Sequence, residues 1–272
     1  MTLVLALKWV TKNGEGVVVS SDSRATVGPI SYEVRKVYPI VLEEDVPLAV
    51  AGGAGDASLV KQGYRICERI LKEMAAKEWG RTTPTFEQFE ETVEQIEGAI
   101  MERMDELRTH GVELDFSMVL ASVDVKGRAS IYVFNERGLA EPVHDNPGFA
   151  LLGRGLFTGG ALLLNLLGYA AEESYALDLG LLSTFVIDVV SGVDPSVGPF
   201  VGESWYMRVE KGRVVLGPLK GEALREYKER SRKRRELLRR LWRLLDLVGE
   251  ERFEELLKNL ERSLERDVSE RS

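Results

Sequence analysis

The sequence predicts an α+β fold, because strand-like and helix-like segments occur in separate blocks rather than in alternation. Apolar runs rich in Val and Leu fill residues 2–51. Apolar residues then recur every three or four positions over 56–110, which is helical spacing. Strand-like runs return over 116–152, helical spacing returns over 157–191, and a strand-like pair occupies 203–217.

The first block is expected to hold four strands, at 2–9, 16–22, 34–41 and 46–51. The polar turn from Thr11 to Gly16 joins the first two as a β-hairpin. Glycines at 52–55 end the block, and Asp56 follows as the expected N-cap of a helix.

A break at Thr82-Thr-Pro84 separates this helix from a second one, which Thr83 or Thr85 caps and which ends at His110. The later expected strands are 116–124, 129–135, 139–144, 149–152, 203–210 and 213–217, and the later expected helices are 157–171 and 173–191.

Composition changes after Pro218, which predicts a core domain (1–219) and a charged C-terminal extension (220–272). The extension is expected to form a helical hairpin, 222–246 and 250–267, joined at Gly249. Its apolar positions are Leu237, Leu238, Leu241, Leu244, Leu245, Val248, Phe253, Leu256, Leu257, Leu260 and Leu264. We expect these faces to pack on the core domain or on a neighbouring subunit and to control assembly.

A net charge of −8 argues against a nucleic-acid partner, and the basic stretch 228–243 is interpreted as the solvated side of a helix. No run of 18 apolar residues occurs, so we expect no membrane partner and a cytoplasmic location. Cys67 is the single cysteine, which excludes an internal disulfide. His110 and His144 are far apart and expected on the surface, so no metal site is predicted.

Three polar residues suggest a nucleophile near the start of the chain. Removal of Met1 would leave Thr2 at the N-terminus, carrying a hydroxyl nucleophile and, in its own α-amine, a base. A nearby ammonium lowers the pKa of such an amine, and Lys36, expected on the third strand, can supply it. A buried lysine needs an acidic partner, for which Asp22 is the candidate.

These residues stand in four segments: Thr2, the run Ser21–Gly28, the segment Arg35–Pro39 and the run Leu48–Asp56. In this order and spacing they resemble proteasome β-type subunits. That N-terminal-nucleophile hydrolase family includes the 20S β subunits, the bacterial ring protease HslV and the bacterial homologue Anbu. The resemblance weakens towards residue 217 and does not cover the last helices. It implies a four-layer αββα sandwich.

The resemblance also implies site residues. The backbone N–H of Gly52 would stabilise the oxyanion of the tetrahedral intermediate. The residues that would line the pocket for the substrate side chain are Ala25, Thr26, Val34, Tyr38, Val50 and Ala54. None of these carries a charge, so the pocket is expected to be apolar.

The auxiliary residues depart from the family pattern. Where the family has a serine in a Gly-Ser-Gly turn, Leu152-Gly-Arg-Gly155 places Arg154, which could face an acidic group of the substrate. The later Asp-x-x-Ser pattern is represented by Asp194 and Ser196 with altered spacing. We include both in the expected catalytic set.

The expected function is that of a threonine-nucleophile amidohydrolase, which cleaves peptide bonds through an acyl-enzyme ester on Thr2 and needs no cofactor. One alternative is a transpeptidase or protein ligase, in which a peptide amine resolves the ester. The other is a non-catalytic scaffold subunit, as proteasome α subunits are, although their helix before the first strand is missing here. The expected partners are a peptide or protein substrate and further copies of the chain, in a ring or stacked dimers. An ATPase partner is left open.

Overall fold

The computed structural model describes residues 2–11, 14–27, 30–43, 46–199, 201–219 and 221–269. The chain divides into two compact units, residues 1–228 and 229–272. Their boundary lies inside the long helix α5 (Glu222–Val248).

Two five-stranded antiparallel sheets form the centre of the first unit. The first sheet has the order β10 (Phe149–Leu152), β1 (Val4–Thr11), β2 (Gly14–Asp22), β11 (Val201–Glu210), β12 (Arg213–Pro218). The second has the order β5 (Val37–Leu42), β6 (Val46–Gly55), β7 (Phe116–Val123), β8 (Ala129–Phe134), β9 (Ala140–Pro142). A separate small hairpin is formed by β3 (Arg24–Val27) and β4 (Ile30–Glu33).

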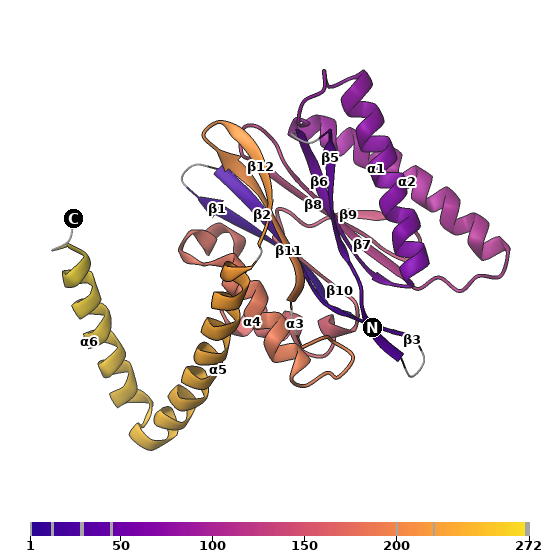
Figure 1. Cartoon of the computed structure of the whole chain (residues 1–272). Helices are drawn as coiled ribbons and strands as arrows, with labels where there is room; N and C mark the ends of the chain where they lie inside the picture. Colours follow the sequence, from indigo (N-terminus) through magenta and orange to yellow (C-terminus); the bar gives the residue numbers. More distant parts are fainter. Residues whose placement is uncertain are drawn as a thin grey trace. The chain divides into compact units, whose positions relative to one another are not determined.

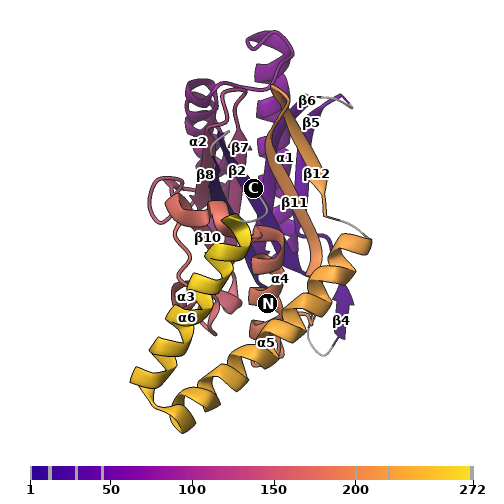
Figure 2. The same cartoon turned by 90° about the vertical axis from the view of Figure 1, so that its left-hand side faces the viewer.

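Helices cover the outer faces of both sheets (Figures 1 and 2). The second sheet is covered by α1 (Ala57–Lys77) and α2 (Phe86–Thr109), and the first by α3 (Gly160–Leu166) and α4 (Leu179–Ser191). Three apolar clusters fill the spaces: one under α1 and α2, one between the sheets, and one under α3 and α4. The fold is therefore the expected α+β, four-layer αββα sandwich.

Several boundaries differ from the sequence-based expectation. The two helices expected over 157–191 are interrupted: short 3-10 turns, η1 (Arg154–Leu156) and η2 (Ala171–Ala176), precede α3 and α4. The hairpin β3–β4 was not anticipated. Lys36 does not lie on a strand, because β5 begins one residue later.

Local signals explain the helix starts. The Asp56 carboxylate accepts hydrogen bonds from the backbone N–H groups of Ser58 (2.7 Å) and Leu59 (3.3 Å) at the start of α1. At α2, Thr85 and Gln88 form a capping box, so Thr85 rather than Thr83 is the cap.

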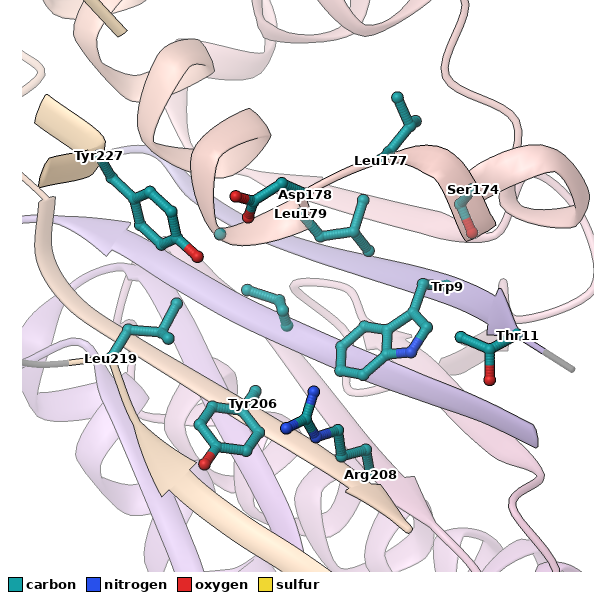
Figure 3. Close-up of a pocket in the computed structure, with 12 residues that line it drawn as sticks. Trp9, Thr11, Ser174, Leu177, Asp178, Leu179, Tyr206, Arg208, Leu219 and Tyr227 are labelled. Carbon is teal, nitrogen blue, oxygen red and sulfur yellow. The ribbon is translucent and has the colours of Figure 1, made fainter. Parts of the chain in front are cut away.

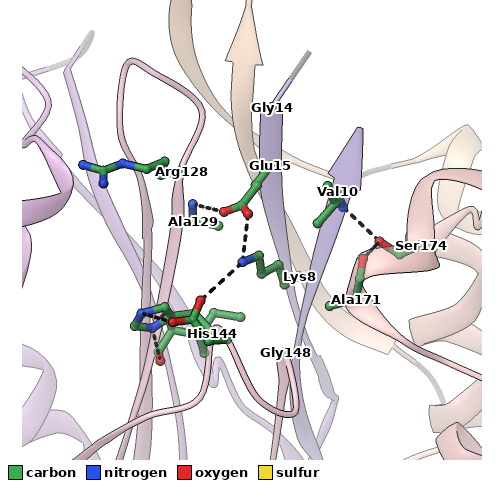
Figure 4. A network of polar contacts seen from close by, with 12 residues as sticks. Lys8, Val10, Gly14, Glu15, Arg128, Ala129, His144, Gly148, Ala171 and Ser174 are labelled. Carbon is green, nitrogen blue, oxygen red and sulfur yellow. Dashed lines mark hydrogen bonds and ion pairs between the residues drawn. The ribbon is translucent and has the colours of Figure 1, made fainter. Parts of the chain in front are cut away.

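A polar network ties the two sheets together at the end where β1 stops (Figure 4). Lys8, which is buried, pairs with Glu15 at 2.9 Å, and Glu15 accepts a hydrogen bond from the Ala129 backbone N–H at 2.8 Å. His144 is also buried, contrary to expectation: its ring lies against Phe86 and Tyr132, and its Nδ1 lies 3.3 Å from the Ile131 carbonyl oxygen. These contacts give the polar groups of Lys8, Glu15 and His144 partners at the place where the two sheets meet, so that none of the three is buried without one.

The C-terminal unit consists of most of α5 and of α6 (Glu250–Ser269), separated by Gly249. The expected helical hairpin is thus present, although its helices diverge from the bend (Figures 1 and 2). None of the helices in the described ranges combines the length and apolar character needed to cross a membrane.

The Asp56 cap predicts a pH-dependent contribution to stability. The Ser58 hydroxyl hydrogen bond holds the pKa of Asp56 below its usual 3.8. The stabilisation is therefore complete above about pH 4 and is lost as pH falls through the lowered pKa. Asp56→Ala should reduce the free energy of unfolding by about 1 kcal/mol at pH 7. Urea unfolding measures it, and Asp56→Asn is the control, because Asn caps without titrating. Equal stability of Asp56→Ala and wild type at pH 7 would contradict the cap.

Candidate active site

Thr2, Asp22 and Lys36 meet in one buried hydrogen-bond network. The Thr2 hydroxyl donates to Asp22 Oδ1 at 3.1 Å, and Lys36 Nζ donates to the same oxygen at 2.6 Å. The hairpin register causes this meeting: β1 and β2 are antiparallel, so the residues just before Val4 lie opposite the end of β2 at Asp22. Lys36 approaches from the second sheet.

Backbone amides hold the Asp22 carboxylate from three further directions. Leu3 N–H donates to Oδ1 at 2.9 Å, and the N–H groups of Arg24 (3.0 Å) and Gly198 (2.7 Å) donate to Oδ2. The side chain is fully buried. Both oxygens are therefore fixed, which is the condition under which a buried carboxylate is tolerated.

Lys36 is the inward residue of its segment, and its neighbour Arg35 is exposed. Burial lowers the pKa of Lys36, and the charge of Asp22 opposes that shift. Lys36 Nζ also donates to the Arg24 carbonyl oxygen. Arg35 instead pairs with Glu203 on β11 at 3.2 Å, and Glu203 accepts from Val37 N–H at 3.3 Å. These contacts fix the register that turns Lys36 inward.

The loop after β10 holds the backbone of the threonine. Gly155 N–H donates to the Thr2 carbonyl oxygen at 3.2 Å. Gly153 has φ of 81°, and a Cβ there would lie 2.4 Å from the same oxygen. Close approach to Thr2 thus explains Gly153, and close approach to Leu3 explains Gly155, where a Cβ would lie 2.7 Å from Leu3 Cβ.

Arg154, Asp194 and Ser196 form a second polar group beside this network. Ser196 donates to Asp194 Oδ1 through its backbone N–H (2.8 Å) and its hydroxyl (2.5 Å). Burial would raise the pKa of Asp194, but hydrogen bonds from Ser196 and Thr158 and the charge of Arg154 hold it below its usual value. The group connects to Asp22 through the segment that carries Gly198. Arg154 therefore faces a carboxylate of its own chain.

A cavity of about 930 Å³ opens beside Thr2. Its lining includes three predicted pocket residues, Val34, Tyr38 and Ala54. The expectation of an apolar pocket is wrong, because the further lining residues include Tyr32, Arg35, Lys36, Asp56, Lys61, Glu113 and Asp115. Four of these, Asp56, Lys61, Glu113 and Asp115, come from the start of α1 and the loop before β7, so strand patterns near the N-terminus do not reveal them.

Val50, another predicted pocket residue, is fully buried between the two sheets, four residues before Ala54 on β6. Ala25 and Thr26 belong to β3, which provides the carbonyl bound by Lys36, but their side chains lie outside the described part of the chain.

Gly52 lies in the middle of β6, paired with Val37 on one side and Val119 on the other. A Cβ at Gly52 would lie 2.8 Å from Val4 Cγ1, so glycine lets the two sheets approach there. The β6 residues that line the cavity are the next three, Gly53, Ala54 and Gly55.

Sequence reasoning missed Gly198 and Glu203. Both contact residues far away in the chain. The Gly198 N–H donates to Asp22, and the Glu203 carboxylate pairs with Arg35 and accepts from the Val37 N–H. The glycine two residues after Ser196 was a usable signal, because a Cβ at Gly198 would lie 2.7 Å from Arg24 N. No local pattern identifies Glu203.

A second cavity, of about 440 Å³, lies on the outer face of the first sheet (Figure 3). Trp9, Tyr206 and Tyr227 line it together with Arg208 and the start of α4 at Asp178. It adjoins the far end of β1, on the order of 20 Å along the strand from Thr2. Because Thr2 and Lys36 line the larger cavity and not this one, we place the candidate chemistry in the larger cavity. Over the described ranges, no three His, Cys, Asp or Glu residues are grouped to hold a metal ion.

Comparison with known proteins identifies the fold. No family model and no curated protein sequence matches the chain. Among solved structures, a Gly-1 mutant of Anbu from Hyphomicrobium sp. strain MC1 matches with a TM-score of 0.65 and 13% identity, over 90% of this chain and 100% of that one. Anbu from Yersinia bercovieri, described as an ancestral β-subunit, matches with a TM-score of 0.63 and 12% identity, over 88% and 96%. The chain has the proteasome β-type, N-terminal-nucleophile hydrolase fold.

The buried ion pair predicts a large stability effect. Lys36→Met keeps the length of the side chain but removes the cation next to Asp22. We expect the free energy of unfolding to fall by about 3 kcal/mol, the lower end for breaking a buried pair, because three amides still bind the carboxylate. Denaturant unfolding measures the loss. Lys77→Met, at an exposed lysine of α1 that pairs with Glu73 on the surface, is the control and should cost under about 1 kcal/mol. Equal losses in the two variants would show that the pair is not specially buried.

Proposed function

We propose that this protein, which has a proteasome β-type fold, is a threonine-nucleophile amidohydrolase that cleaves peptide bonds. The observation that carries the proposal is the network joining the Thr2 hydroxyl, Asp22 and Lys36 beside a cavity of about 930 Å³. Removal of Met1 would give Thr2 the free α-amine that the chemistry requires.

The reaction would proceed in two acyl transfers. The Thr2 α-amine accepts the hydroxyl proton as Oγ1 attacks the substrate carbonyl carbon. The tetrahedral intermediate collapses when the amide C–N bond breaks, and the leaving amine takes the proton from the α-ammonium. Water then attacks the ester in the same way, releasing the acid and restoring Thr2.

Lys36 and Asp22 would set the basicity of the amine. A positive charge close to the α-amine disfavours its protonated form and so lowers its pKa from about 7.7–8.0. Asp22 keeps Lys36 positioned and opposes the effect of burial on its pKa. The Gly153–Gly155 loop would fix the nucleophile by holding the Thr2 carbonyl oxygen.

The oxyanion donor is assigned to the glycine-rich end of β6. The resemblance gives this role to Gly52, and Gly53–Gly55 provide the backbone that lines the cavity. Asp194, Ser196 and Arg154 would support the site from the side of the Gly198 segment. The charged rim favours a peptide with polar side chains over a purely apolar one.

Covalent labelling tests the nucleophile. An epoxyketone directed at N-terminal threonine should add one adduct to the protein after Met1 is removed, located at Thr2 by intact and peptide mass spectrometry. Thr2→Ala should give no adduct and no peptidase activity, whereas Thr2→Ser should retain labelling because it keeps Oγ. Peptide cleavage by the Thr2→Ala protein at the wild-type rate would exclude this mechanism.

The pH–rate profile tests the role of Lys36. Without the ammonium, the α-amine pKa should rise, so the acid limb of kcat/KM in Lys36→Met should move to higher pH and the rate at pH 7 should fall at least tenfold. Lys77→Met, at an exposed lysine far from the cavity lining, should keep the wild-type limb. If Lys36→Met loses rate equally at every pH, Lys36 positions the network but does not tune the amine.

A further inference from the structure

The cavity of about 440 Å³ on the outer face of the first sheet has no role in the chemistry at Thr2 (Figure 3). Thr2 and Lys36 line the other, larger cavity. The volume of the smaller one lies within the range of about 300–1,000 Å³ that is usual for small-molecule sites. Trp9, Val18 and Tyr206 reach it from three neighbouring strands, and the start of α4 forms one wall.

Two strand glycines make room for the aromatic rings of this cavity. Trp9 lies opposite Gly16 in the pairing of β1 with β2, and a Cβ at Gly16 would lie 2.3 Å from the indole ring. Tyr206 lies opposite Gly217 in the pairing of β11 with β12, and a Cβ at Gly217 would lie 2.7 Å from the phenol ring. Each ring therefore lies over the bare backbone of a neighbouring strand, and both rings stay partly exposed.

Arg208 lies beside these rings with one edge of its guanidinium unused. Its Cζ atom is 5.2 Å from the centre of the Tyr206 ring, which is a cation–π contact. Nε and Nη2 both pair with Glu210 Oε1, at 2.7 Å and 2.5 Å. Within the part of the chain that the structure describes, Nη1 donates to no acceptor. Because the Arg208 side chain lines the cavity and is half exposed, Nη1 can donate to an anionic group of a ligand.

A carboxylate lies on the α4 side of the same cavity. Asp178 is the N-cap of α4, and its side chain accepts a hydrogen bond from the Leu181 N–H at 3.1 Å. Asp178 is only partly buried and lines the cavity. Leu177, Leu179 and Leu219 add apolar surface to the lining. The cavity thus combines one cation, one anion and apolar or aromatic walls.

This combination selects a ligand that carries both charges. Asp178 repels a purely anionic ligand, and Arg208 repels a purely cationic one. A molecule with a free carboxylate, a free ammonium and an apolar side chain matches both charged groups and also covers the aromatic surface.

We propose that this cavity binds a zwitterionic amino acid or short peptide that has an aromatic or large aliphatic side chain. The carboxylate of the ligand accepts from Arg208, its ammonium donates to Asp178, and its side chain lies against Trp9. The site lies at the opposite end of β1 from Thr2 and is independent of the chemistry there.

Calorimetry with the full chain tests the requirement for both charges. The probe is glycyl-phenylalanine, and its N-acetyl and amide derivatives each lack one charge. We expect the dipeptide to bind at least about tenfold more tightly than either derivative, because each loses one charge-assisted hydrogen bond. Free phenylalanine is measured beside it: binding as tight as that of the dipeptide identifies an amino-acid site, and weaker binding identifies a peptide site. Equal binding of the dipeptide and both derivatives, or no binding of any probe at millimolar concentration, would overturn the proposal.

Charge variants assign the two contacts. Arg208→Gln should bind the dipeptide and its amide equally, because the partner of the carboxylate is gone. Asp178→Asn should bind the dipeptide and its N-acetyl form equally, and its asparagine still caps α4. Arg213→Gln, at an exposed position of β12 outside the cavity lining, is the control and should keep the wild-type preference. A wild-type preference in both charge variants would contradict the assignment.

Tryptophan fluorescence locates the bound peptide. The dipeptide should change the emission of the wild-type protein, because its side chain lies against Trp9. In Trp9→Phe this change should disappear. An equal change in Trp9→Phe would place the ligand elsewhere on the protein and overturn the proposal.

Discussion

The candidate site depends on keeping the Asp22 carboxylate buried with both oxygens hydrogen-bonded. Five donors reach it: Leu3 N, Thr2 Oγ1 and Lys36 Nζ on one oxygen, and the amides of Arg24 and Gly198 on the other. They come from both sheets, the small hairpin and the loop before β11. Removing water from a charge costs several kcal/mol, and only a complete donor set offsets that cost. The Asp22 carboxylate therefore connects segments that lie far apart in the sequence.

Close backbone approach is the second constraint at this end of the sandwich. Gly52 admits Val4 between the sheets, Gly153 admits the Thr2 carbonyl, and Gly198 admits Arg24. A methyl group at any of these positions would meet neighbouring atoms at 2.4–2.8 Å. Thr2 is thus positioned by packing that tolerates no Cβ at these three glycines.

The contacts that position Thr2 all belong to one of the two compact units. All of the polar contacts that position Thr2 lie within residues 2–203, inside the first unit. The C-terminal helices contribute none of the described contacts of the network, and their exposed apolar faces are suited to association.

The sequence by itself determined the order of the strand and helix segments and the caps at Asp56 and Thr85. It also singled out Thr2, Asp22 and Lys36 as candidate site residues. Each of these follows from local periodicity, capping chemistry or residue order, which act over a few residues. The alternation of residues 34–38 already favoured Lys36 as the inward side chain, but only the tertiary structure shows what holds it there: Glu203, from a distant strand, binds its neighbour Arg35. The tertiary structure also decided that the cavity is charged and that His144 is buried, since both depend on residues brought together from different layers. Contacts between residues far apart in the chain produce no periodicity or regular spacing in the sequence. Sequence patterns therefore cannot predict them.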